Sequence, residues 1–130
     1  MRIAALSLLL GAAALAAPAS AQSFVGEWRA TAAVPDGEVS ETLTVAKTAD
    51  GYAVTAKDVE PPPAEGMTAG PGVNVQLDGD SFAYKRIVET PNGPVEIVYK
   101  GVVSGDTFTG TGEVMGFSVP YNGVRLSKPD

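Results

Sequence analysis

The sequence predicts an all-β fold, a single eight-stranded antiparallel up-and-down β-barrel that follows a cleaved signal peptide. Three observations support this prediction: short runs alternate apolar and polar residues, turns rich in Gly, Asp, Asn and Pro divide them, and no helical period of useful length follows the N-terminal stretch. Eight strands are enough to close a barrel whose interior is filled by side chains or holds one small ligand.

The N-terminal stretch has the composition of a targeting signal. Arg2 supplies a charged n-region, Ile3–Leu10 begins an apolar h-region, and Ala19-Ser20-Ala21 matches a signal-peptidase site. The apolar stretch is short and no second one follows it, so we do not expect a retained membrane-spanning helix. We expect a signal peptide over residues 1–21, a single domain over residues 22–130, and a periplasmic or secreted protein.

The alternating runs define the expected strands. Asp50-Gly51 is the strongest hairpin signal, because Asp-Gly suits a type I′ turn whose twist matches that of paired strands. Pro120 is a misfit in the last run, since its missing N–H predicts a bulge or a gap in pairing. In each run, alternate residues are expected to point into the barrel. Counted in steps of two, these inward residues run from Phe24 to Val34, Leu43 to Val45, Tyr52 to Ala56, Val73 to Leu77, Phe82 to Val88, Val95 to Val103, Phe108 to Val114, and Phe117 to Arg125.

Residues 60–72 interrupt the strand pattern. Pro61, Pro62 and Pro63 cannot donate hydrogen bonds to a ladder, and the glycines that follow keep the segment irregular. It is the longest connection in the domain and it carries Met67. Long connections often serve as lids or binding loops, but this one could equally be a spacer across one barrel end.

Residues near the two ends of the domain could bring the first and last strands together and close the barrel. Trp28 is the only tryptophan of the chain and lies in the first run, with Gly26 on the same face, whereas Arg125 lies in the last run. If the guanidinium of Arg125 lies across the indole, the cation–π contact stabilises the fold by roughly 0.5–2 kcal/mol. In this interpretation the first and last strands meet and the sheet has no free edge.

Four glycines fall on the inward faces of the last three runs. They suit either the strong coiling of strands in a small barrel or the presence of space inside it. The pattern leaves both reasons open. The four are Gly101, Gly110, Gly112 and Gly123.

The Phe24-x-Gly26-x-Trp28 start, Arg125 on the last strand and the eight-strand meander resemble a calycin, the group that holds lipocalins, fatty-acid-binding proteins and avidins. The chain is also similar to bacterial lipocalin-like domains in which Gly-Asp turns divide Thr- and Gly-rich strands, as in residues 103–111. The resemblance implies a barrel that binds a small ligand. One tryptophan argues against the biotin site of avidins, and the chain lacks the disulfides and flanking helix of larger lipocalins.

Composition excludes several kinds of chemistry. The chain has no cysteine and no histidine, which removes thiol chemistry, the Ser-His-Asp triad and the usual zinc ligands. We therefore expect no metal site and no cofactor. The net charge of −6 disfavours nucleic acid and anionic membranes as partners, and its simplest role is solubility.

Residue parity selects candidate ligand-binding side chains. Tyrosines offer an apolar ring and one hydroxyl, which suits a ligand cavity and a packed core equally. Arg86 would need a buried partner or an anionic ligand, although a shift of one residue would turn Lys85 inward instead. An acidic ligand bound by Arg86 would place its apolar end near Met67. The candidates are Tyr84, Arg86, Tyr99, Tyr121, Glu41 and Met67.

Three functional classes follow from the sequence. The barrel binds a small apolar or amphipathic ligand, or it is a metal-free isomerase, cyclase or hydrolase that uses the same pocket, or it is a structural or partner-binding barrel without a cavity. Glu41 with Arg86, or Tyr84 with Tyr99, could perform acid–base chemistry, but no spacing requires it. The sequence identifies no catalytic residue, no ligand and no oligomeric state.

Overall fold

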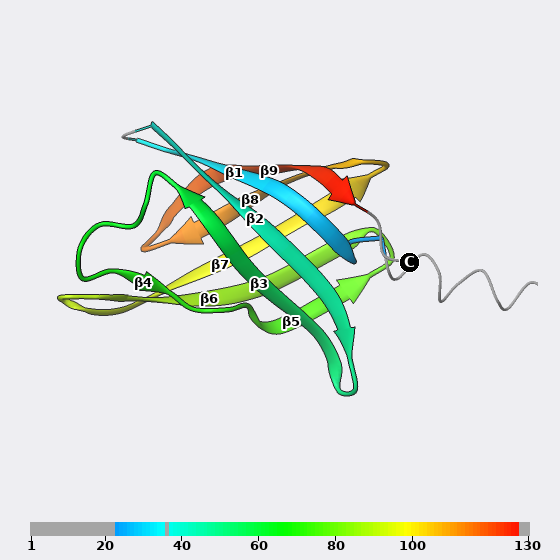
Figure 1. Ribbon diagram of the computed structural model, residues 1–130, viewed down its shortest axis with the longest axis horizontal. Helices are drawn as coiled ribbons and strands as arrows, with labels where there is room; N and C mark the ends of the chain where they lie inside the picture. The colour runs from blue at the N-terminus through cyan, green and yellow to red at the C-terminus, as the bar shows by residue number, and fades with distance from the viewer. Residues whose placement is uncertain (1–22, 36, 128–130) are drawn as a thin grey trace, which may run out of the picture.

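The computed structural model describes residues 23–35 and 37–127 as one strongly curled antiparallel sheet, a half-barrel (Figure 1). The expected signal peptide, residues 1–21, lies outside the described residues. In Figure 1, β1 to β3 cross in front of β6 and β7, so the two halves of the sheet face each other. The strands are β1 (Gly26–Val34), β2 (Gly37–Thr48), β3 (Gly51–Glu60), β4 (Thr68–Ala69), β5 (Val73–Asp78), β6 (Ser81–Thr90), β7 (Gly93–Ser104), β8 (Thr107–Val114) and β9 (Phe117–Ser127).

The first and last strands meet, as the sequence predicts. The sheet runs in the order β3-β2-β1-β9-β8-β7-β6-β4, and β5 also pairs with β6. Trp28 is paired with Arg125 in the β1–β9 ladder, and the Arg125 guanidinium lies 4.2 Å from the centre of the indole ring. Arg125 also donates hydrogen bonds to the carbonyl oxygens of Ser23 and Val25, which fixes the start of the domain against β9.

The sheet is not fully closed, so the expectation of a sheet without a free edge was wrong. β3 lies at one end of the strand order and β4 at the other. Between β3 and β5 the Gly72 N–H donates a hydrogen bond of 2.8 Å to the Val54 carbonyl, and we call this junction the seam. β3 is protected as an edge strand, since its ladder shifts register between Ser40 and Thr42 and Pro61 follows its last residue.

Three local details differ from the predicted strands, and the first is that Phe117, which parity placed inside, is 71% exposed. The segment 60–72 contains a two-residue strand, β4, which raises the strand number from eight to nine. In β5 the register shifts between Val73 and Gln76, and Asn74 adopts a positive φ of 54°. Val73 is thus paired with the outward residue Lys85 and is itself exposed, whereas parity alone placed it inside.

Pro120 lies where the pairing of β9 with β1 stops. β9 pairs with β1 only as far as Tyr121, which is opposite Ala32, while the β8–β9 ladder continues in register through Thr111 and Pro120. The predicted gap in pairing is therefore present on the β1 side, where a proline without an N–H costs no ladder bond.

Aromatic rings fill the interior at the end of the half-barrel near Trp28. Phe24 stacks on Phe82 with ring centres 3.9 Å apart, and the Trp28 indole N–H donates to the Phe24 carbonyl at 2.9 Å. Phe108 packs edge-on against Trp28 at 5.2 Å. Such ring pairs add roughly 0.5–1.5 kcal/mol each beyond the burial of their apolar area.

Candidate functional site

Five of the six predicted site residues converge inside the half-barrel, and we call them the interior polar cluster. Arg86 is only 4% exposed and Glu41 only 8%, while Lys85 lies on the outer face with its ammonium 3.7 Å from Glu96. The structure thus places Arg86, not Lys85, inside the half-barrel. The interior polar cluster consists of Glu41 on β2, Tyr84 and Arg86 on β6, Tyr99 on β7 and Tyr121 on β9.

Arg86 is held by the protein itself. Its Nη1 donates to Glu41 Oε2 at 2.6 Å, and its Nε donates to the Gly70 carbonyl at 2.9 Å. Burial lowers the pKa of Arg86, but the charge and hydrogen bond of Glu41 outweigh burial, so the net pKa is raised and the guanidinium stays protonated. Because Glu41 neutralises this charge, Arg86 is not a free anchor for an acidic ligand.

The ion pair also bridges the open side of the sheet. Glu41 comes from β2 and Arg86 from β6, which belong to the two halves that approach at the seam. Gly70, the third partner, lies between β4 and β5. The pair therefore links both sides of the seam from within, and its clearest role is to hold the half-barrel in its curled shape.

The tyrosines form a stacked and hydrogen-bonded group. The hydroxyls of Tyr84 and Tyr121 lie 2.5 Å apart, and the Tyr84 and Tyr99 rings stack at 5.0 Å. Burial is the largest cause that raises the pKa of all three phenols. They remain protonated at neutral pH and serve as hydrogen-bonding groups of the core, whereas a general base would need a pKa near the working pH.

Met67 lies apart from the interior polar cluster. Its side chain is 39% exposed, and its segment is fixed to β6 by the pairing of Thr68 with Glu89 and by a hydrogen bond from Gly70 N–H to the Ile87 carbonyl. The loop is therefore attached along β6 for part of its length. The interpretation as a spacer accounts for these contacts.

Aromatic side chains lie beside three of the four inward glycines, Gly101, Gly112 and Gly123, whereas a Cβ at Gly110 would meet the backbone of β7. A Cβ at Gly123 would lie 2.1 Å from Phe108 Cε2, and a Cβ at Gly101 would lie 2.7 Å from Phe82 Cζ. In both pairs the glycine and the ring are direct cross-strand partners. These glycines thus allow large rings to lie flat against the neighbouring strand, and the space that they leave is filled by the protein itself.

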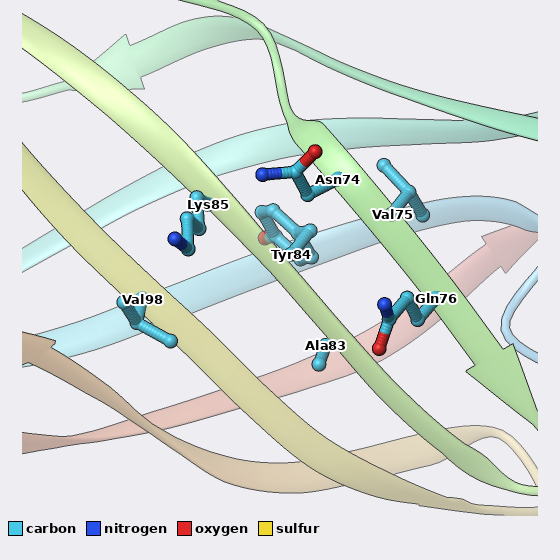
Figure 2. A pocket seen from close by; sticks show the side chains of 7 residues that line it. All are labelled: Asn74, Val75, Gln76, Ala83, Tyr84, Lys85 and Val98. Atoms are coloured by element: carbon cyan, nitrogen blue, oxygen red, sulfur yellow. The ribbon is translucent and has the colours of Figure 1, made fainter.

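An open cavity of about 360 Å³ lies where the β5 register shift separates β5 from β6. Figure 2 shows the Asn74 and Gln76 side chains extending from β5 toward β6. Tyr84 is the one member of the interior polar cluster that reaches it. Its lining combines amide and ammonium groups with apolar surface: Asn74, Val75, Gln76, Ala83, Tyr84, Lys85 and Val98.

A second open cavity, of about 540 Å³, continues from the first across the outer face of β6, β7 and β8. The two share Gln76 and Ala83, so we treat them together as the outer groove. Along it, Gln76 is paired with Ala83, Ala83 with Lys100, and Lys100 with Thr111. The second cavity also includes Asp78, Ser81, Phe82, Gly101, Val102, Thr109 and Gly110.

Parity analysis missed the outer groove because it treats every outward side chain as solvated surface. The signals that could have indicated it are small: an alanine among long outward residues on β6, and Asn74, a residue type that tolerates the left-handed conformation of a bulge. Neither signal shows by itself that two neighbouring strands separate. The separation depends on how β5 pairs with β6, which is a tertiary property.

No group of three or more acidic residues that could hold a metal ion occurs in the described ranges 23–35 and 37–127. Within the same ranges, no helix has the length and apolar character needed to cross a membrane.

Comparison with solved structures finds a protein with a similar fold, and the sequence comparisons find no match. No protein-family model matches the chain, and no curated protein matches its sequence. The crystal structure of secretory abundant heat soluble protein 4 from Ramazzottius varieornatus is similar with a TM-score of 0.49 and 15% sequence identity. The alignment covers 82% of this chain and 96% of the neighbour.

Proposed function

We propose that this protein is a small exported calycin-like barrel that binds a small apolar or amphipathic molecule, and that the ligand binds in the outer groove near Tyr84. The observation that supports this location is the open cavity of about 360 Å³ at the β5 register shift. Small-molecule sites typically have volumes of roughly 300–1,000 Å³ and combine apolar walls with a few polar groups. Val75, Ala83 and Val98 supply such walls, and Asn74 and Gln76 supply amides.

The interior is a poor location for the same ligand. The rings of Phe82 and Phe108 lie against the inward glycines, and Glu41 already neutralises Arg86. A ligand there would have to displace packed aromatic side chains, whose burial contributes to the stability of the fold. The outer groove is open, so a ligand there displaces no packed aromatic side chain.

The calycin relationship and export rest on sequence features. Gly26 and Trp28 on the first strand, with Arg125 on the last, support the relationship, and the charged and apolar segments within residues 1–21 support export to the periplasm or the medium. Intact-mass analysis of protein from its native cell tests export. We expect a mature chain that begins at Gln22, whereas a retained Met1 would contradict it.

Binding of the neutral fluorophore N-phenyl-1-naphthylamine tests the ligand site. Ala83 is outward, lines both cavities and is small, so Ala83→Leu should fill the outer groove and weaken binding about ten-fold. Ala53→Leu is the matched control, because Ala53 is an outward alanine on β3 that lines neither cavity. Absence of binding by the wild type, or an equal loss in both variants, would refute the proposed site.

A structural or partner-binding barrel is the second candidate, favoured by the filled interior. It requires no ligand, and the same fluorophore experiment separates the two functions. Failure of the wild-type protein to bind any apolar probe, with the fold intact by circular dichroism, would favour this second function.

A further inference from the structure

We propose that the ligand carries an anionic head group that binds Lys100, while its apolar part lies over Ala83 and reaches toward Tyr84. This inference rests on the proposed function and adds the chemical class of the ligand. The outer groove supplies the path, because its two cavities meet at Gln76 and Ala83. Lys100 is on β7 directly opposite Ala83, so its side chain lies next to the point where the cavities join.

Lys100 is the free cation of this groove among the described residues. No acidic oxygen of the described residues lies within 4 Å of its ammonium, whereas the Lys85 ammonium lies 3.7 Å from Glu96. Lys47 and Lys57 also lack an acidic partner at that distance, but they lie on β2 and β3 and line neither cavity. An anion that enters the outer groove therefore finds one uncompensated positive charge.

The surroundings of Lys100 also suit an anionic oxygen. Thr109 and Thr111 on β8 line the same cavity, and threonine hydroxyls can donate to an anion. Asp78 lines the cavity as well and repels an anion. Its cross-strand partner is Ser81, so Asp78 lies beside the next outward residue of β6 and not beside Ala83, the partner of Lys100. The head group is therefore expected at the Lys100 and Thr111 side of the groove, away from Asp78.

The apolar part of the ligand has a continuous surface. From Lys100 the groove passes over Ala83 to Val98 and Val75, which are partly buried, and the exposed Val102 adds apolar surface on the other side. A chain-like or flat apolar group that runs along this path buries these side chains, and its polar end remains at the solvent-exposed lysine. The arrangement thus selects an amphipathic anion over a purely polar anion.

Displacement of N-phenyl-1-naphthylamine by dodecanoate and by dodecanol tests the inference, because the two compounds share one chain and differ in charge. Above about pH 7 the carboxylate is ionised. We expect the wild type to prefer dodecanoate about three- to ten-fold at low salt, and Lys100→Gln to remove this preference while dodecanol binds as before. Lys57→Gln is the control and should keep the preference. Raising the salt concentration to about 1 M, where the Debye length is about 3 Å, should reduce the preference in the wild type.

Each contrary result has a defined meaning. Equal binding of the two compounds by the wild type, or an unchanged preference in Lys100→Gln, would overturn the role of Lys100 and leave the proposed binding function standing. Absence of fluorophore binding by the folded wild type would overturn the proposed function and this inference together. Lys100 is exposed, so the substitution should leave the fold intact, and circular dichroism of the variant checks this.

Discussion

The buried ion pair of Arg86 and Glu41 gives the sharpest prediction about stability. Arg86→Met leaves the Glu41 carboxylate buried without its partner, and removal of one member of a buried pair costs about 3–5 kcal/mol. The substitution also removes the donor to the Gly70 carbonyl, which costs about 1 kcal/mol. We expect a total loss of about 4–6 kcal/mol, a large part of the roughly 5–15 kcal/mol that stabilises a typical domain.

The double variant Arg86→Met/Glu41→Leu distinguishes the cost of an unpaired buried charge from the cost of changed side-chain packing. Apolar residues of similar volume often replace a buried pair without loss, so the double variant should lie within about 2 kcal/mol of the wild type. Urea unfolding followed by the fluorescence of Trp28, the single tryptophan, measures both variants. Lys85→Met, the outward neighbour, is the control, and its exposed pair should change stability by less than about 1 kcal/mol. A double variant as unstable as Arg86→Met, or a cost below about 1 kcal/mol for Arg86→Met alone, would refute the reasoning.

Three further predictions concern the rest of the fold. Gly123→Ala should destabilise by about 1–3 kcal/mol in urea unfolding, because its Cβ would lie 2.1 Å from a carbon of Phe108, whereas Asn122→Ala on the outer face should have little effect. Met115→Asn should stabilise by about 1 kcal/mol, because Met115 has a φ of 51° in a turn and is 78% exposed, and asparagine tolerates this conformation; unchanged or lower stability would contradict it. The three phenols of the interior polar cluster have raised pKa values, so the unfolded chain loses these protons first, near pH 10. Below about pH 10 the phenols contribute their full stabilisation, and above it the free energy of unfolding should fall by up to about 1.4 kcal/mol per pH unit for each phenol. Thermal melts at increasing pH, with tyrosinate absorbance, measure this fall. A melting temperature that stays constant above about pH 10 would contradict it.

Sequence parity predicted most of the fold because alternation in a strand is a local property. It placed Trp28 opposite Arg125 and Glu41 inside, and it left open whether Arg86 or Lys85 points inward. It failed at Val73, because a register shift changes which face a residue occupies and no residue type at that point requires the shift. It also could not show that the sheet stays open at the seam, since closure depends on how far β3 and β5 approach in space.

The candidate site was only partly predictable for a related physical reason. Parity identifies which side chains point inward, but the free volume inside depends on the residues that lie opposite them. Here the partner of Gly101 is Phe82 and the partner of Gly123 is Phe108, so the smallest inward residues face two of the largest. Glycines that would enlarge a cavity beside small residues instead allow dense packing beside aromatic rings.

This packing also explains why binding is expected on the outer face. Aromatic rings pack against one another on the concave side of the sheet, so the binding that we propose uses a place where the ladder itself is interrupted. The β5 register shift is such a place, because it interrupts the ladder between β5 and β6 and leaves an open cavity of about 360 Å³ there. In the same proposal, Glu41 and Arg86 pair with each other across the seam, and the uncompensated charge that a ligand could use lies outside, at Lys100.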